Sequence, residues 1–563
     1  RNAEKLLLWL LLPAFAACLS VKLPNGDFVK GEVFKSKSAV GTIFHGIRYA
    51  NPQGPHNRFR LAEPFVKGPD SPPLQIPLPL PSCGTDNTTS FREDCLYLTI
   101  WQPQGSKIAG EPPRPVMVHI HPGALHKLSP MSGNYNWMHW ATQTQTIVVG
   151  ITFRLGIFGH YASVELNKEQ GGRIGNNGFL DQRLALQWIR DNIGVFGGDP
   201  SRVFLFGLSS GALACAWHAA SPGSTGLFHG CIAESGPGGE NYYQAKADSF
   251  RFWGWFTEKF FGCATLECVR SVDAAALNIF VGNETQGWPD WAPATFPAFP
   301  YAGMMDGTDI VEYPVTMARE GMCEVLNCSI GRVPVILAST AEECHSFMPR
   351  VVQFIPTLTH LKAQKTGLMQ AVGKEARAAF ADWFAGWQMD EEVMDLACDM
   401  YPAWMYESGG SLLSYMYRDQ RYTCPQQRLF RAWNSWKSGR EKTAPAYFVF
   451  NQRGKRSGRM AMHGWLYEGV LELTPRSHEM LCYYAGLIHK GDPNSQPDVP
   501  ACKAMSPHKS KAHAFQRMPS SLDSAHDQDV SYILVPQHDT TPIQAFKFPV
   551  SYRDRTSARD PPS

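Results

Sequence analysis

The middle of the chain alternates apolar runs with stretches of helical spacing. Residues 116–120 and 147–151 are nearly continuous apolar runs, typical of strands buried on both faces. Residues 181–193 carry Leu, Ala, Trp and Ile at helical spacing, and 203–206 form another apolar run. A second helical stretch begins at Ala212. This alternation predicts an α/β fold with a large central, mostly parallel sheet flanked by helices.

The flanking regions extend this pattern. Short β-type runs near 28–34 and 40–49 indicate a small antiparallel sheet before the parallel part. Apolar runs at 333–337 and 447–450 predict two later strands. Long aromatic-rich helical segments, roughly 240–320 and 360–440, complete the pattern, and we expect most of their aromatic residues to be core packing.

The composition and net charge of the chain argue against nucleic acid as its partner. Hydrophobic residues make up 44% of the 563 residues and charged residues 18%, so the chain can bury a large core. The formal net charge is +2, from 52 basic and 50 acidic side chains, and no long Lys/Arg run is present. Nucleic acid is therefore not the expected partner, because phosphate binding needs a concentrated basic surface.

The N-terminal segment has the features of a secretory signal peptide. A basic start containing Lys5 precedes an apolar run at 6–12 and then small residues. The run is too short to span a bilayer, and no later run reaches 18 apolar residues, so we expect no stable membrane anchor. We predict a signal peptide at 1–20 and a secreted protein with one domain at 21–563. Fourteen cysteines suit that compartment, as do possible glycosylation sites at Asn87, Asn283 and Asn327.

The strongest chemical signal is a G-x-S-x-G motif at residues 207–211. It directly follows a predicted strand and directly precedes a predicted helix, which is the context of a nucleophile elbow. The turn is so tight that the positions two before and two after the serine must be glycine. We therefore predict Ser209 as a catalytic nucleophile.

A serine hydroxyl needs a base to remove its proton and an acid to orient that base. Glu342 and Glu343 follow the predicted strand at 333–337, and His463 follows the strand at 447–450. The chain order of serine, acid and histidine is that of an esterase triad. Context alone does not separate Glu342 from Glu343.

Several further motifs occur in a fixed order along the chain. They are residues 93–98 (E-D-C-L-Y-L), 176–182 (N-N-G-F-L-D-Q), 196–200 (F-G-G-D-P), 207–211 (G-L-S-S-G), 221–223 (S-P-G), 234–236 (E-S-G) and 491–494 (G-D-P-N). In these motifs the chain resembles the type-B carboxylesterase and cholinesterase family over essentially its whole mature length. Within that family it is most similar to the secreted fungal esterases.

The resemblance implies an α/β-hydrolase fold and assigns roles to individual residues. The family's acid motif falls on 342–347 and selects Glu343, and its H-G motif falls on His463. Its oxyanion loop falls on 121–125, so the backbone N–H groups of Gly123 and Ala124 would act with that of Ser210. Pro122 lacks an N–H group but does not occupy a donor position.

Two positions depart from the family pattern. Leu208 replaces the glutamate that usually precedes the nucleophile, and the acidic residue usual soon after His463 is missing from His463-Gly464-Trp465-Leu466. Neither change affects the predicted triad. Together they are compatible with a slow enzyme or an unusual substrate.

The cysteines are interpreted partly through the same resemblance. The family's first two disulfides correspond to Cys83–Cys95 and Cys263–Cys268. Cys323 and Cys328 are close enough in sequence to pair. Cys215 and Cys231 lie in core-type segments, and we expect buried free thiols there. No Cys/His cluster has zinc-ligand spacing, so the sequence predicts neither metal nor cofactor.

Three functions remain open at this point. The first is an active carboxylesterase acting on a small-molecule ester through an acyl-enzyme on Ser209. The second is a cholinesterase-like binding protein with weak or no catalysis, which Leu208 favours. The third is a lipase, disfavoured because the loop between Cys83 and Cys95 is too short for a lid. The cholinesterases of the family that the chain resembles place a tryptophan in this loop to bind choline. Residues 84–94 contain none, so choline esters are not expected. The oligomeric state is left open.

Overall fold

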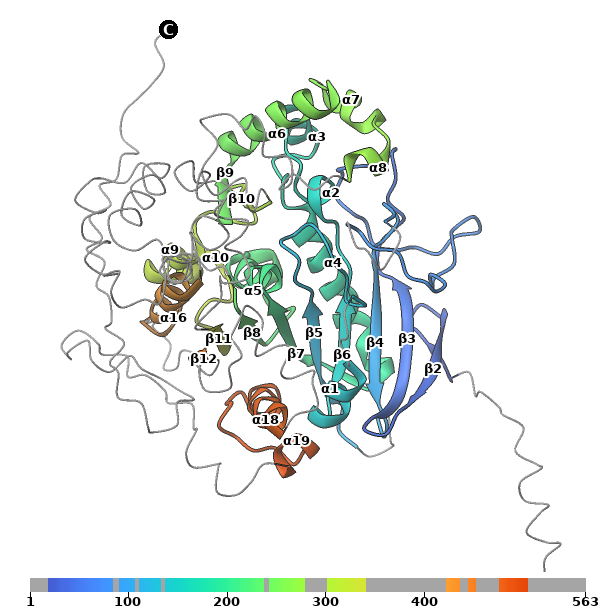
Figure 1. Cartoon of the computed structure of the whole chain (residues 1–563), viewed down its shortest axis with the longest axis vertical. Helices are drawn as coiled ribbons and strands as arrows, with labels where there is room; N and C mark the ends of the chain where they lie inside the picture. The colour runs from blue at the N-terminus through green and yellow to red at the C-terminus, as the bar shows by residue number, and fades with distance from the viewer. Residues whose placement is uncertain are drawn as a thin grey trace, which may run out of the picture.

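The computed structural model describes residues 19–84, 91–106, 111–132, 137–236, 242–278, 301–340, 422–435, 444–451 and 475–504. Within these ranges most strands belong to one sheet. Their bounds are β1 Leu19–Lys22, β2 Phe28–Lys35, β3 Val40–Arg48, β4 Tyr97–Pro103, β5 Arg114–Ile120, β6 Ile147–Ile151, β7 Gly198–Leu208, β8 Gly230–Glu234, β11 Val335–Thr340 and β12 Ala446–Asn451. Their order across the sheet is β1-β2-β3-β4-β6-β5-β7-β8-β11-β12 (Figure 1).

The sheet has an antiparallel part and a parallel part. Strands β1 to β4 pair antiparallel in sequence order, and β4 pairs antiparallel with β6. From β6 to β12 every neighbouring pair is parallel. The predicted antiparallel sheet at the start of the chain and the predicted mostly parallel sheet are both confirmed. A separate parallel pair joins β9 (Tyr243–Ala245) to β10 (Gly303–Met305).

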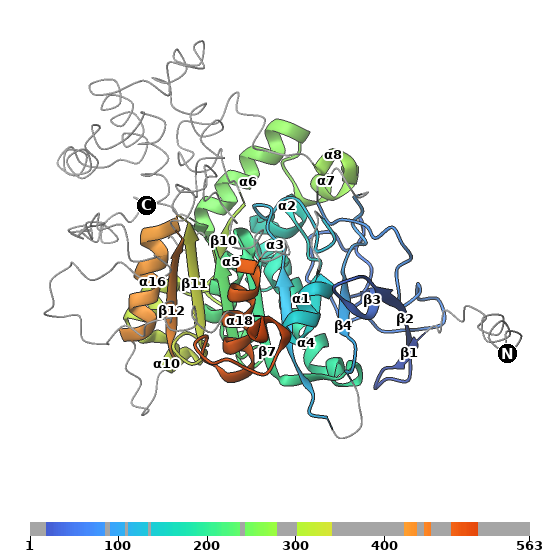
Figure 2. The same ribbon diagram turned by 60° about the horizontal axis from the view of Figure 1, so that its bottom comes forward.

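Helices cover both faces of the parallel strands. On one face lie α1 (Trp137–Thr144), α18 (Pro475–Lys490) and α19 (Pro500–Lys503), seen in front of the sheet in Figure 2. On the other face lie α4 (Asn177–Asn192), α5 (Ser210–Ala220) and α16 (Cys424–Ser435). The remaining helices are α2 Gly156–His160, α3 Val164–Glu169, α6 Lys246–Phe261, α7 Leu266–Ser271, α8 Ala274–Leu277, α9 Pro314–Arg319 and α10 Met322–Leu326, with short 3₁₀ turns at Ile193–Phe196 and Pro222–Ser224.

The burial of both faces explains the continuous apolar strands. On β5, Val116 and Val118 pack into the core under α4 and α5, whereas Met117 packs into the core under α1 and α18. Successive side chains of a strand point to opposite faces, so both sets must be apolar when helices cover both faces.

Most predicted elements are confirmed, with shifted ends. The run at 147–151 coincides with β6, and α4 begins at Asn177, four residues before the predicted start. Strand β7 begins at Gly198 because Gly197, with a φ of 81°, ends the preceding 3₁₀ turn and lets the chain reverse. Only 422–435 of the predicted helical segment 360–440 is described, and α16 (Cys424–Ser435) occupies most of it.

The aromatic residues of α6 are largely core, as predicted. Phe252, Trp253 and Phe256 are buried and contact one another at ring-centroid distances of 5.0 to 5.9 Å. In Figure 1 α6, α7 and α8 lie beyond one end of the sheet. They therefore form a cover over that end rather than a face layer.

The predicted disulfides Cys83–Cys95 and Cys263–Cys268 are confirmed, and Cys323 pairs with Cys328, a pairing that the sequence left open. A fourth, which the sequence did not assign, joins Cys482 of α18 to Cys502 of α19. Cys215 and Cys231 are buried free thiols, as predicted.

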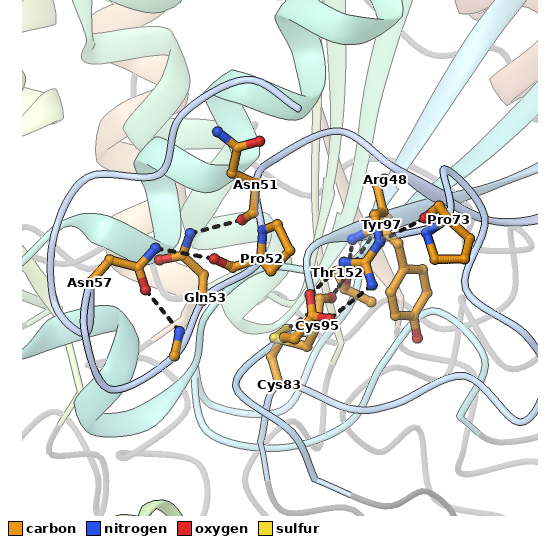
Figure 3. Close-up of polar contacts among 12 residues, drawn as sticks. Arg48, Asn51, Pro52, Gln53, Asn57, Pro73, Cys83, Cys95, Tyr97 and Thr152 are labelled. Carbon is orange, nitrogen blue, oxygen red and sulfur yellow. Dashed lines mark hydrogen bonds and ion pairs between the residues drawn. A yellow bond between two sulfur atoms is a disulfide. The ribbon is translucent and has the colours of Figure 1, made fainter. Parts of the chain in front are cut away.

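Polar contacts anchor the Cys83–Cys95 disulfide to the sheet (Figure 3). The Thr152 hydroxyl donates to the Cys95 carbonyl at 2.5 Å and accepts from the Tyr97 N–H at 2.9 Å. Arg48 donates to the Pro73 carbonyl at 3.0 Å. Thr152 thus holds Cys95 beside the start of β4, and Arg48 ties the end of β3 to the segment before Cys83. None of the helices in the described ranges combines the length and apolarity that crossing a membrane requires.

Candidate functional site

The carboxyl ends of the parallel strands meet at one edge of the sheet and bring two loops together. Ile120, the last residue of β5, pairs with Gly207 of β7. The loop after β5 carries residues 121–125, and the turn after β7 carries Ser209. Open α/β sheets bind ligands at this edge.

Ser209 occupies a strained turn between β7 and α5. Its φ is 57° and its ψ is −121°, a conformation that costs a non-glycine residue about 1–3 kcal/mol. Its N–H donates to the Glu234 carbonyl at 3.0 Å, and its side chain is half-buried. Ser210, the first residue of α5, presents an N–H group that has no intrahelical acceptor.

Two glycines make this turn possible. A Cβ atom at Gly207 would lie 2.2 Å from the main chain of Gly211, and a Cβ atom at Gly211 would lie 2.0 Å from the Ile120 carbonyl oxygen. Both distances are far below any real contact. Helix α5 therefore packs directly against the end of β5, and the serine stands at the edge between them.

The loop after β5 is built from consecutive residues with positive φ. Gly123, Ala124 and Leu125 have φ values of 122°, 56° and 58°. The Gly123 carbonyl accepts from the N–H groups of His126 at 3.0 Å and Lys127 at 3.1 Å. The Leu125 carbonyl accepts from the Gly156 N–H at 2.8 Å. The loop is thus held by main-chain hydrogen bonds in spite of its strain.

Two stacked histidines support the same loop. His121 stacks on Phe153 at a centroid distance of 4.5 Å, and His126 stacks on Tyr301 at 5.5 Å with an interplanar angle of 5°. Burial lowers the pKa of His126 to about 3, so this ring is neutral at ordinary pH. The His126–Tyr301 contact could not be predicted, because the partners are far apart in the chain.

Replacing Ala124 by glycine is expected to raise the free energy of unfolding by up to about 1 kcal/mol, because glycine tolerates positive φ. The matched control is Ala216→Gly in the middle of α5, where an ordinary helical conformation makes the same change cost about 1 kcal/mol. Urea unfolding measures both. A loss of stability in the Ala124→Gly variant would show that the alanine is not strained.

Leu208, which directly precedes the nucleophile turn, is a buried residue of β7. Its side chain is 7% exposed and belongs to the apolar core under α1 and α18. It pairs in register with Glu234 of β8, whose carboxylate accepts a hydrogen bond from the Tyr484 hydroxyl of α18. The buried carboxylate beside Leu208 is therefore that of Glu234 on β8. The sequence did not indicate that Glu234 is buried there.

The other predicted triad residues, Glu343 and His463, lie outside the described residues. Strand β11 ends at Thr340, three positions before Glu343, and β12 ends at Asn451, twelve positions before His463. Both strands run parallel to β7. The chain therefore leaves β7, β11 and β12 at the same edge of the sheet.

Of the predicted glycosylation sites, Asn87 and Asn283 also lie outside the described residues. Asn327 is exposed at the end of α10, where its side-chain oxygen accepts from Arg332. Across the described ranges there is no group of three or more His, Cys, Asp and Glu side chains that could hold a metal ion.

Buried histidines around the site give a pH-dependent stability. Burial lowers the pKa of His218 on α5 to about 3 and that of His160 to about 4. Below about pH 6.5 these histidines become protonated in the unfolded chain but stay neutral in the folded protein. The free energy of unfolding therefore falls as the pH falls. Each such histidine contributes about 1.4 kcal/mol per pH unit.

Urea unfolding between pH 6.5 and pH 5 tests this prediction. The slope of unfolding free energy against pH is expected to be smaller in His218→Gln than in the wild type, by about 0.7 kcal/mol per pH unit at pH 6.5 and about 1.4 near pH 5. The slope is the readout, because loss of the His218 contacts to Ser224 and Gln182, both at 2.9 Å, lowers stability at every pH. Equal slopes would show that His218 is protonated in the folded protein.

A model of the carboxylesterase family matches residues 17–533. Acetylcholinesterase-1 of Trittame loki is 35% identical over 224 residues, which cover 38% of this chain and 39% of that protein. Pyrethroid hydrolase Ces2e of Rattus norvegicus is 37% identical over 225 residues, which cover 38% of each chain.

Bile salt-activated lipase of Rattus norvegicus is 33% identical over 287 residues, which cover 48% of this chain and 45% of that protein. The chain spans between 35% and 56% of the length of these and similar curated relatives.

Proposed function

Because the chain belongs to the carboxylesterase family, we propose that it is a serine carboxylic-ester hydrolase of the α/β-hydrolase fold with Ser209 as its nucleophile. The observation that carries the proposal is the strained turn at Ser209, supported by the two glycines that let α5 start directly behind it. Strain of this kind persists where the surrounding structure enforces it, and it presents the hydroxyl above the sheet edge.

The proposed reaction is acyl transfer in two steps. Ser209 Oγ attacks the ester carbonyl carbon while His463 removes its proton, and the same histidine then protonates the departing alcohol. Glu343 orients the imidazole. Water, deprotonated by His463, then attacks the acyl-enzyme carbonyl. The bond to Ser209 Oγ breaks, His463 returns the proton to that oxygen, and the acid is released.

The oxyanion of each tetrahedral intermediate would be bound by three backbone N–H groups. Those of Gly123 and Ala124 come from the loop after β5, and that of Ser210 comes from the start of α5. The pairing of Ile120 with Gly207 supports this role, because it places the two segments beside each other. Fixed donors of this kind stabilise developing charge without reorganisation.

A small-molecule ester is the proposed substrate. The cysteines of the disulfide Cys83–Cys95 are only 12 positions apart, and so short a loop supports an esterase over a lipase with a long lid. The binding-protein alternative rests on Leu208, yet Leu208 lies in an apolar core and leaves the turn at Ser209 intact.

We further propose that the mature protein is a secreted glycoprotein. The support is the predicted signal peptide at 1–20, the four disulfides among the described residues and the exposed Asn327. Residues 21–563 would form the single catalytic domain. Glycosidase treatment of the secreted protein, compared with Asn327→Gln, tests the glycan at that position.

The test of the proposed activity is hydrolysis of p-nitrophenyl esters from acetate to palmitate by the purified protein. An esterase is expected to prefer short acyl chains below their solubility limit. A preference for palmitate that rises at the emulsion interface would indicate a lipase. No turnover on any ester by the folded protein would favour the binding-protein alternative.

A further inference from the structure

A buried hydrogen bond connects α18 to the strand behind the nucleophile. The Tyr484 hydroxyl donates to the Glu234 carboxylate, and the two side chains are 0% and 1% exposed. The residues are 250 positions apart in the chain. Burial raises the pKa of Tyr484 well above its usual value, as does the nearby Glu234, so the phenol keeps its proton and acts as the donor.

Glu234 also binds the nucleophile turn directly. Its carbonyl accepts the Ser209 N–H at 3.0 Å, and its neighbour Ser235 has a φ of 48° and donates its N–H to the Ala338 carbonyl at 2.7 Å. The Glu234 carbonyl thus lies between two residues with positive φ, because Ser209 donates to it and Ser235 follows it in the chain. A small displacement of Glu234 would move the hydrogen bond that holds Ser209 in its conformation.

Tyr484 is well placed to prevent such a displacement. Its ring stacks on Trp140 of α1 at 5.7 Å and contacts Phe206 of β7 at 5.9 Å. The hydroxyl therefore has a fixed position in an apolar core. A carboxylate in such a core is costly unless it is hydrogen-bonded, so Glu234 is held where Tyr484 donates to it.

We propose that Glu234 and Tyr484 form a clamp that positions Ser209 for attack on the ester. Neither residue touches the substrate, and both act through the main chain of the nucleophile turn. The clamp rests on the proposed esterase function. It links β8, which supports Ser209, to α18, the first described helix after His463 in the chain.

The test compares Tyr484→Phe, which removes only the hydroxyl, with Tyr243→Phe. Tyr243 is also buried, and its hydroxyl has no hydrogen-bond partner among the described residues. We expect kcat of the folded Tyr484→Phe enzyme to fall about tenfold with KM unchanged, since small misplacements of reacting groups cost this much or more. Tyr243→Phe is expected to stay within about twofold of the wild type.

A second readout does not depend on activity. Hydrogen exchange of the peptide 203–213, followed by mass spectrometry, is expected to quicken in Tyr484→Phe and not in Tyr243→Phe. Glu234→Gln keeps an oxygen that can accept the Tyr484 hydroxyl, so it is expected to retain slow exchange.

The outcomes separate the clamp from the proposed function. If Tyr484→Phe keeps wild-type kcat per folded molecule, or if its exchange at 203–213 is unchanged, the clamp is wrong although the esterase stands. If the wild type hydrolyses no ester, the proposed function fails, and the exchange measurement still decides whether Tyr484 holds the turn.

Discussion

Ester hydrolysis is expected to fall by a factor of about 10⁴ to 10⁶ when Ser209 is replaced by alanine, because the acyl-enzyme can no longer form. The residual rate would come from substrate binding and the oxyanion donors, which the substitution leaves in place. The measurement is the initial rate on p-nitrophenyl acetate with matched concentrations of folded protein.

A matched control for this substitution is Ser271→Ala, at an exposed serine at the end of α7. It is expected to retain wild-type turnover. If Ser209→Ala also retained turnover, the nucleophile would have to be another residue, and the strained turn would need a structural explanation.

Replacing Gly211 by alanine is expected to cost more than about 4 kcal/mol, enough to prevent folding of many domains. The added Cβ atom would lie 2.0 Å from the Ile120 carbonyl oxygen and 3.0 Å from its carbon. Both are main-chain atoms of a buried strand, so neither can move without breaking the pairing of β5 and β7. Soluble yield and urea unfolding measure the loss.

The same change at Gly254 is expected to have the opposite effect on the free energy of unfolding. Gly254 lies on the exposed face of α6, and a Cβ atom there would meet nothing within 4 Å. Gly254→Ala is expected to stabilise the protein by about 1 kcal/mol, because alanine is the better helix former. If both variants behaved alike, the close approach of α5 to β5 would be wrong.

The parallel strands could be predicted because burial on both faces demands apolar residues at every position. The run at 147–151 coincides with β6, and 203–206 marks the centre of β7. Strands β4 and β8 were absent from the predicted strands. β8 is five residues long and contains Gly230 and Glu234, so its sequence has no clear strand pattern.

The position of Glu234 shows why part of the site could not be predicted. A glutamate at the end of an apolar strand is usually interpreted as solvent-exposed, yet this one is buried. Its donor, Tyr484, comes from a helix 250 positions later. Only the tertiary structure brings the two together.

The turn at Ser209, in contrast, could be predicted from the sequence. The glycines at 207 and 211 are local features, and their steric necessity follows from a strand that passes directly into a helix. The loop at 121–125 is intermediate. Its three consecutive positive φ values could not be predicted from a Pro-Gly-Ala-Leu sequence, in which only the glycine favours that conformation.

The role of Ser209 as nucleophile can be tested by labelling the folded protein with a fluorophosphonate ester, followed by peptide mass spectrometry. Such a reagent phosphonylates a serine only when a base and an oxyanion site activate it. We expect one adduct per molecule on Ser209, formed at the rate at which esterase activity is lost. An unlabelled protein, or an adduct on another residue, would contradict that role.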